Sequence, residues 1–388
     1  MDRRNFLKLT GTCTGGMLLL PDFLHSYALQ DNPGNSGNNC ILFIQLNGGN
    51  DGLNTFIPYQ DELYYKYRPA IAISKNNVIA ASGGMAFHPS LKGLAEIQQK
   101  GDLTVLQNVG YPEPSHSHFR SQEIWQTGSA ANDYLNTGWL GRFLDHHYKQ
   151  HMPTAGINVD TTDNLALRGL EPNSIAIRDT RKMTSHLKVN ATLSSNPQLD
   201  FVRKIANSAP EGYTLINKAI DKTTETENLY PKNVVGKNLQ WIARLIKGGL
   251  NSDVYYTSHN GFDTHDNQLG AQKGRLQEVD EAVLAFYKDI KAARKLDEVT
   301  VVIFSEFGRR VADNGRGTDH GTAAPMFIIG GKNKGKIIGK NPDLVNLVDG
   351  DLKHEIDFRS VYASLLKNKF AFNPADIGIK NTALTGIF

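Results

Sequence analysis

Runs of apolar residues alternate with amphipathic segments along most of the chain. Residues 40–46 form an apolar run interrupted only by Gln45, which is typical of a strand buried on both faces of a sheet. Elsewhere apolar residues recur every three or four positions, most clearly at Leu276, Val279 and Val283, and this spacing predicts a helix with one face on the sheet. We expect further strands at 103–107, 253–258, 299–304 and 326–329, and helices near 90–100, 119–127, 138–145, 276–290 and 358–366. This alternation predicts a layered α/β domain.

The pattern changes in two regions, which suggest the domain organisation. Residues 29–39 are rich in Asn and Gly, so we interpret them as a flexible linker before a domain that covers 40–388. Between 151 and 237 the alternation weakens into polar stretches, which we interpret as a cap or insertion in that domain.

Residues 1–28 resemble a twin-arginine signal peptide. Arg3 and Arg4 precede two bulky apolar residues, a mild apolar stretch continues to Leu20, and the segment ends in Ser26-Tyr-Ala28. We therefore expect recognition by the twin-arginine export machinery and a periplasmic or secreted protein. As the resemblance implies, this route carries folded proteins and suits one that acquires a metal before export.

Charge and composition exclude several classes of partner. The 388 residues carry a formal net charge of +3. Removal of 1–28 takes away three basic and two acidic residues and leaves +2, too balanced for a nucleic-acid binder. No run beyond the leader has the roughly twenty apolar residues that span a bilayer, so we expect no stable membrane insertion after cleavage. Only Cys40 remains in the mature chain, which excludes an internal disulfide.

Acidic and imidazole side chains follow the predicted strands. Asp51 lies in a Gly-rich turn after the first strand, Asp263 and His265 follow the strand at 253–258, and Glu306 follows the strand at 299–304. A further pair, Asp319 and His320, precedes the strand at 326–329. Helix caps and solvated turns would explain each feature alone. If the strands are parallel, all six residues meet at one sheet edge and predict a metal site.

The residue types limit the metal without identifying it. Two histidines with carboxylates suit zinc or manganese, and the surplus of carboxylates leaves magnesium or calcium open for a second position.

The order strand, Ser305-Glu-Phe-Gly308, loop, His320-Gly321, strand resembles the C-terminal core of the alkaline phosphatase and sulfatase superfamily. The leader, together with Gly-Gly-Asn-Asp-Gly, Gly-Trp-Leu-Gly-Arg, Phe-Asp-Thr-His and Thr-Asp-His-Gly, is similar to an exported bacterial family within it, domain of unknown function 1501. The resemblance implies a three-layer α/β/α fold with a mostly parallel central sheet. It also implies metal-ligand roles for Asp51, Asp263, His265 and His320.

Three departures from the superfamily pattern affect the metal site. Phe307 stands where the superfamily has a metal-binding His, Glu306 replaces an Asp, and the Asp263–His265 spacing is shorter than the superfamily's. A phenyl ring binds no cation, so we expect one position to be lost or remodelled. Asp263, His265 and His320 are the better supported ligands.

Catalytic residues are expected at the start of the helix after 103–107. Helix N-termini favour anions, and Ser117 is the candidate nucleophile there. His118 is a candidate base or ligand, and Arg120 or Arg309 could hold an oxyanion. An N-cap serine with exposed histidines, and a structural ion pair for Arg309, remain the alternatives. The stretch lacks the Cys/Ser-x-Pro-x-Arg pattern of formylglycine sulfatases.

Two functional hypotheses follow. The first is an exported, metal-dependent hydrolase of phosphate or sulfate esters, acting on a small anionic ester or a sulfated or phosphorylated glycan. The second is a non-catalytic exported protein that keeps the fold and binds a metal or ligand, which Phe307 favours. A metallopeptidase would need a His-Glu-x-x-His helix, which the sequence lacks.

Overall fold

A computed structural model describes residues 39–178, 197–224, 226 and 228–388. The signal peptide predicted at 1–28 and nearly all of the predicted linker lie outside the described residues. None of the described helices is both long and apolar enough to cross a membrane.

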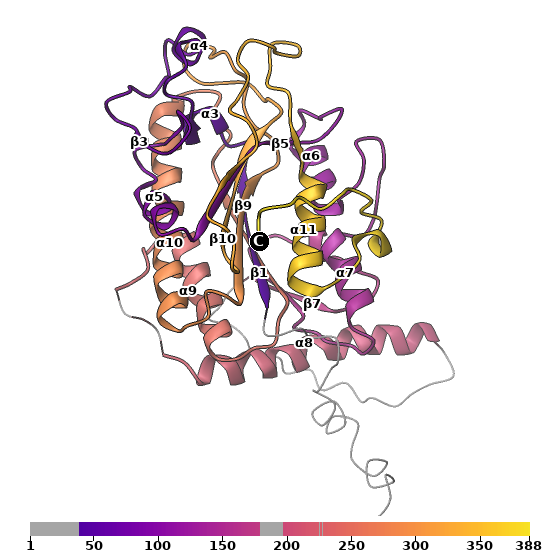
Figure 1. Ribbon diagram of the computed structural model, residues 1–388. Helices are drawn as coiled ribbons and strands as arrows, with labels where there is room; N and C mark the ends of the chain where they lie inside the picture. The colour runs from indigo at the N-terminus through magenta and orange to yellow at the C-terminus, as the bar shows by residue number, and fades with distance from the viewer. Residues whose placement is uncertain (1–38, 179–196, 225, 227) are drawn as a thin grey trace, which may run out of the picture. The chain divides into compact units, whose positions relative to one another are not determined.

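A mixed, mostly parallel sheet forms the centre of the domain (Figure 1), which confirms the predicted α/β class. Its order in the described residues is β11-β5-β10-β9-β1-β8-β6-β7, with β12 also paired to β5. The strands are β1 (Cys40–Asn47), β5 (Leu103–Gly110), β6 (Gly156–Val159), β7 (Ser174–Ile177), β8 (Val254–Asn260), β9 (Val299–Ser305), β10 (Ala324–Gly330), β11 (Ile337–Ile338) and β12 (Ile356–Asp357).

Strand direction explains why separate loops meet at one edge. β1 pairs in parallel with both β8 and β9, so Asn47, Asn260 and Ser305 end side by side. The predicted strand at 326–329 is β10, which runs antiparallel to β9 and to β5. The assumption that β10 is parallel is therefore wrong, but the reversed direction of the strand favours the predicted site. Because β10 is reversed, the loop before it, with Asp319 and His320, reaches the carboxyl edge of the parallel strands.

Helices cover both faces of the sheet, as a three-layer arrangement requires (Figure 1). The two faces of β1 show why: Leu42, Ile44 and Leu46 enter one core, whereas Ile41 and Phe43 enter the other. The first core contains residues of α5 (Lys92–Gln99), α9 (Val234–Lys247) and α10 (Gln268–Ala292). The second contains residues of α6 (His118–Thr127), α7 (Trp139–His147) and α11 (Phe358–Phe370).

Residues 151–237, expected as a cap or insertion, contribute to the central sheet as well. They supply β6, which pairs with β8, and β7, which forms the edge. They also supply α8 (Pro197–Asp221) and η2 (Leu165–Leu167). The remaining elements are α3 (Gly52–Thr55), α4 (Glu62–Tyr67), η3 (Pro374–Ile377) and a small sheet of β2 (Phe56–Ile57), β4 (Ala86–Phe87) and β3 (Ile79–Ala80).

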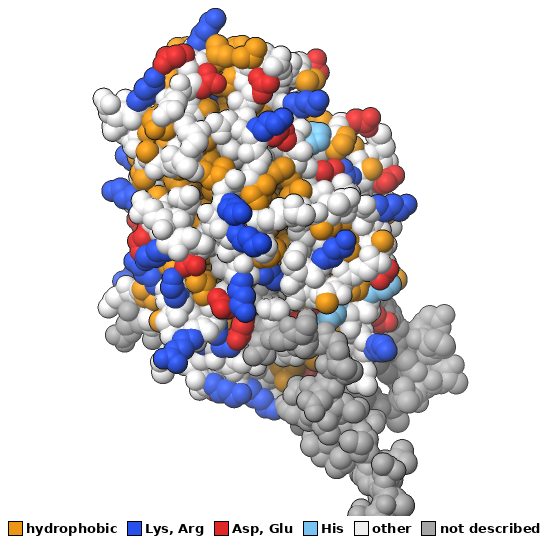
Figure 2. All heavy atoms as spheres, in the orientation of Figure 1, with side chains coloured by type: hydrophobic (Ala, Val, Ile, Leu, Met, Phe, Trp, Pro, Cys, Tyr) orange, Lys and Arg blue, Asp and Glu red, His pale blue; other side chains and the backbone are white. Residues whose placement is uncertain are grey.

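Charges are mixed on the surface. On the face in Figure 2, Lys and Arg side chains are scattered among Asp and Glu and form no continuous basic field.

Candidate metal centre

The loops after β1 and β8 are packed against each other at the carboxyl edge. The amide of Phe262 donates to the carbonyl of Asn47, at 3.1 Å. Gly48 has φ +119°, and a Cβ there would lie 2.3 Å from the backbone nitrogen of Asp263, so only glycine allows this approach. The packing fixes the backbone of Asp263 three residues beyond the end of β8.

Asp263 is the centre of a cluster of imidazoles. Its Oδ1 lies 3.1 Å from His265 Nε2 and 3.3 Å from His320 Nε2, and its Oδ2 lies 3.4 Å from His118 Nε2. The carboxylate and one nitrogen each from His118 and His320 all lie within 4.8 Å of one another. Of the residues expected to meet at one sheet edge, Asp263, His265 and His320 lie together here, and His118 at the start of α6 joins them.

Each of the three histidines has its other ring nitrogen held by an oxygen acceptor. His118 Nδ1 lies 3.0 Å from Glu306 Oε1, His265 Nδ1 lies 3.1 Å from Asp319 Oδ1, and His320 Nδ1 lies 2.7 Å from the His116 carbonyl. When the proton is on Nδ1, each Nε2 can offer its lone pair to a cation bound beside Asp263. Metal-binding histidines are oriented in this way by carboxylates and carbonyls.

Two observations indicate that the cluster fits a cation. His118 Nε2 is buried and has no hydrogen-bond partner among the described residues. The Nε2 atoms of His265 and His320 are only 2.9 Å apart, and two lone pairs at that distance repel unless a proton or a metal ion lies with them. A set of imidazole nitrogens and one carboxylate suits zinc or a similar divalent ion.

Glu306 is a buried carboxylate that orients His118. Burial alone would raise the pKa of Glu306, but hydrogen bonds from His118, the Gly48 amide and Gln122 outweigh it and lower the pKa. The hydrogen bond to Glu306 in turn raises the pKa of His118. For Asp263, partial burial is outweighed by the neighbouring Arg309 and His320 side chains, which lower the pKa to about 2. Both carboxylates are therefore ionised at neutral pH.

A family model described as "Protein of unknown function (DUF1501)" matches residues 38–366. The chain belongs to this family. The match confirms the family resemblance that the motifs from Gly48 to Gly321 predicted. A comparison with curated proteins found no match.

Solved structures similar to this DUF1501 chain share little sequence with it. The C-terminal periplasmic domain of EcEptC from Escherichia coli, in complex with Zn, is 10% identical, with 76% of this chain and 73% of that chain covered and a TM-score of 0.35. The phosphonate monoester hydrolase SpPMH from Silicibacter pomeroyi is 11% identical, with 77% and 70% covered and a TM-score of 0.39. A protein in the alkaline phosphatase superfamily from Vibrio parahaemolyticus is 14% identical, with 79% and 63% covered and a TM-score of 0.37.

Asp51, the other predicted ligand from a strand-end loop, has a different partner. Its Oδ2 lies 2.5 Å from Arg68 Nη1, and both side chains are fully buried. Gln268 Nε2 donates to the same oxygen. Arg68 also donates to Asn54 and to the carbonyls of Arg310 and Val311, so its guanidinium is held firmly in place. A guanidinium thus occupies the position where a metal beside Asp51 was expected.

The two predicted anion-binding arginines are also engaged in protein contacts. Arg120 donates to the carbonyls of Ala131 and Asp133, and its guanidinium carbon lies 3.8 Å from the centre of the Tyr134 ring. Arg309 is buried and donates to the carbonyls of Gly49 and Thr318, while its Nη2 lies 2.7 Å from Asp263 Oδ1. Both arginines therefore hold backbone segments in place, and Arg309 does so beside Asp263.

Ser117 and Phe307 are both neighbours of His118. Ser117 is the exposed N-cap residue of α6, and its hydroxyl makes no capping hydrogen bond. Phe307 is buried, with its ring centre 5.0 Å from that of His118 and 4.8 Å from that of His320. The phenyl ring of Phe307 therefore packs against the imidazoles of His118 and His320.

Proposed function

We propose that the chain is an exported, metal-dependent hydrolase of phosphate or sulfate esters. The observation that carries the proposal is the convergence of three Nε2 atoms on Asp263 while every Nδ1 is held by an oxygen. The export route is inferred from the twin-arginine pattern at 1–28, and we propose a periplasmic or secreted location on that basis.

The ligands that we assign are Asp263, His118, His265 and His320, with Glu306 and Asp319 as positioning residues. When bound, a zinc or manganese ion there would polarise the ester oxygens. We assign Asp51 to a structural ion pair, because its side chain is fully buried against that of Arg68, whereas Asp263 is half exposed and faces three imidazoles. This supports one ion in the centre rather than two.

Ser117 is the nucleophile that we propose. It directly precedes His118, so its Cα lies about 3.8 Å from that of a proposed ligand. The first amides of α6 lack helical acceptors and favour the negative charge of a phosphate or sulfate group. In the proposed reaction, Ser117 Oγ bonds to phosphorus or sulfur, the bond to the leaving alcohol breaks, and the serine proton goes to the leaving oxygen. Water then cleaves the serine ester and restores the hydroxyl.

The second hypothesis, a protein that binds a metal without catalysis, is favoured by one feature. Phe307 removes a potential ligand beside His118 and His320. A non-catalytic protein of this kind would bind the ion and turn over no ester.

Metal analysis and an ester screen distinguish the two hypotheses. We expect purified mature protein to contain about one equivalent of zinc or manganese and to hydrolyse 4-nitrophenyl phosphate or 4-nitrophenyl sulfate. Chelation should abolish turnover, and Ser117→Ala should abolish it while the metal content stays unchanged. Metal without turnover of either ester would support the binding protein, and the absence of bound metal after reconstitution would overturn both.

A further inference from the structure

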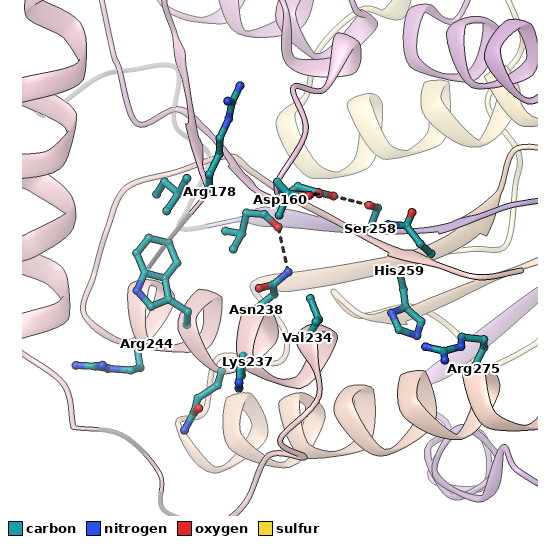
Figure 3. A pocket seen from close by; sticks show the side chains of 15 residues that line it. Asp160, Arg178, Val234, Lys237, Asn238, Arg244, Ser258, His259 and Arg275 are labelled. Carbon is teal, nitrogen blue, oxygen red and sulfur yellow. Dashed lines mark hydrogen bonds between the residues drawn. The ribbon is translucent and has the colours of Figure 1, made fainter. Parts of the chain in front are cut away.

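A cavity of about 770 Å³ lies at the same carboxyl edge as the metal centre, at the ends of β6, β7 and β8 (Figure 3). α9 and α10 complete its walls. Val159, Ile177 and Trp241 give it an apolar floor. Its volume is in the range of sites that hold small organic ligands.

Asn260 links the cavity lining to the loop that carries Asp263. Asn260 lines the cavity, and it lies three residues before Asp263, so the two Cα atoms are at most about 11 Å apart. Asn47 Nδ2 donates to Asn260 Oδ1 at 2.9 Å, and the next residue, Gly48, donates its amide to Glu306. A ligand that extends from the metal centre past Asn260 would enter the cavity.

Charged lining residues are mainly basic. Arg178, Lys237, Arg244 and Arg275 face a single acid, Asp160, whose oxygens already accept from Ser258 and from the Thr161 amide. Figure 3 shows Arg178, Lys237 and Arg275 spaced around the cavity on three different elements.

These cations differ in how firmly they are engaged. Arg244 donates to the carbonyls of Ile220 and Thr223 and acts as part of the wall. Arg178 pairs with Asp163 at 3.0 Å, but both side chains are about two-thirds exposed, and such pairs exchange easily. Lys237 is exposed and makes no ion pair with the described residues. Lys237 is therefore the cation most available to an incoming anion.

The uncharged lining is suited to hydroxyl groups. Asn260 is exposed, and its Oδ1 already accepts from Asn47, so its Nδ2 remains to donate. Thr161, two residues after β6, also lines the cavity, and its hydroxyl donates weakly to Asp160 at 3.3 Å. Amides and hydroxyls beside cations and an apolar floor suit a hydroxyl-rich anion better than an apolar molecule.

We propose that this cavity binds the sugar part of an acidic oligosaccharide whose ester group reaches the metal centre. This assignment of a substrate class rests on the proposed function. Lys237 contacts an acidic group of the sugar other than the ester at the metal centre, and Asn260 contacts a ring hydroxyl between the cavity and Asp263.

Calorimetry on the metal-free mature protein tests the cavity without relying on activity. The probes are maltotetraose 6-sulfate, maltotetraose 6-phosphate and unmodified maltotetraose, which separate the two acidic groups from the sugar. We expect at least one acidic probe to bind and the neutral probe to bind at least about ten-fold more weakly. Lys237→Glu should weaken the acidic probe by a further ten-fold or more, whereas Lys273→Glu, an exposed lysine of α10 outside the lining, should leave it unchanged.

The two proposals can fail separately. Equal binding of acidic and neutral probes, no binding of any probe, or equal effects of Lys237→Glu and Lys273→Glu would overturn the cavity assignment. Turnover of 4-nitrophenyl esters alongside such a result would leave the hydrolase intact. If the protein binds an acidic probe more tightly than the neutral one but turns over no ester, the hydrolase proposal is overturned and the cavity assignment stands. In an active enzyme, Lys237→Glu should raise KM for an oligosaccharide that carries an acidic group besides its ester.

Discussion

Asp51 and Asp263 follow neighbouring parallel strands, yet they have opposite surroundings. Asp51 is fully buried and pairs with Arg68, which is also fully buried. Asp263 keeps 49% of its side chain exposed and, besides Arg309, faces the Nε2 atoms of three histidines. A guanidinium carries a fixed charge and five donors, whereas imidazole nitrogens offer lone pairs to an added cation. Both carboxylates pair with an arginine, so the exposure and the added imidazoles of Asp263, rather than its strand-end position, are what suit it to a metal.

The largest effect that we expect is on stability, at Asp51. Asp51→Ala leaves the Arg68 guanidinium buried without its carboxylate, and loss of one partner of a buried pair costs about 3–5 kcal/mol of unfolding free energy. Urea denaturation of the variant measures this loss.

A double variant and a surface control make the Asp51 test specific. Asp51→Ala combined with Arg68→Met should recover part of the loss, because no unpaired charge then remains buried. Asp266→Ala removes a surface pair with Arg316 and an exposed hydrogen bond from the Asn267 amide, and should change stability by less than about 0.5 kcal/mol. A small loss of unfolding free energy in Asp51→Ala would show that the Asp51–Arg68 pair does not hold the loop after β1 in place.

A third carboxylate near these strands, Asp253, extends the comparison because it has no guanidinium partner. It directly precedes β8 at the opposite sheet edge, and burial raises its pKa to about 7, with Tyr148 offsetting part of the shift. The nearest imidazole nitrogen, His147 Nε2, is 3.7 Å away. Asp253 is thus protonated in the folded chain at pH values where an unfolded aspartate is ionised.

The sign of the pH dependence follows from the raised pKa of Asp253. Between about pH 4 and pH 7 the folded state holds a proton that the unfolded state has lost, so stability should fall as pH rises and level off above pH 7. The full shift corresponds to roughly 4 kcal/mol as an order of magnitude. Asp253→Asn should remove this part of the slope in urea titrations at pH 4, 5.5 and 7.5. Parallel curves for the variant and the wild type would contradict the assignment.

At Asp263 we expect loss of metal with a smaller loss of stability than at Asp51, because Asp263 is half exposed although its partner Arg309 is buried. Outer-shell changes weaken metal binding 10–100-fold, and removal of a direct ligand should exceed 100-fold. Zinc competition against a chromophoric chelator measures the affinity of Asp263→Ala. Asp51→Asn is the matched control and should bind within about three-fold of wild type. Equal losses in the two variants would remove the distinction between the two carboxylates.

Much of the fold could be predicted because long apolar runs are distinct in the sequence. β1, β8, β9 and β10 each contain seven or eight mostly buried residues, and each was predicted within a few residues of its bounds. β6 and β7 have only four residues each, too few for their pattern to stand out within the polar stretch 151–237. Strand direction was also beyond reach for β10, since no local pattern distinguishes a reversed strand.

The ligands could be predicted better than their partners. Asp263, His265 and His320 stand in short motifs beside strand ends, which is a local signal. The pairing of Asp51 with Arg68 depends on how the chain folds back after α4, and no spacing in the sequence indicates it. His116 orients His320 through its backbone carbonyl, a role that residue identity does not reveal.

The smallest effect that we expect is at Asp319, which touches His265 and makes no direct contact with Asp263 in the described structure. Its Oδ1 holds His265 Nδ1 at 3.1 Å, and both side chains are largely exposed. Because an orienting carboxylate contributes about 10–100-fold to metal affinity, Asp319→Ala should weaken zinc binding by that factor, toward the lower end for an exposed pair. Asp319→Asn keeps an acceptor oxygen and should recover part of the loss, while Asp266→Ala, an equally exposed neighbour of His265, should have no effect. If Asp319→Ala binds zinc as tightly as Asp266→Ala, then His265 is oriented by its backbone position alone. In that case Asp319 has no part in what distinguishes the surroundings of Asp263 from those of Asp51.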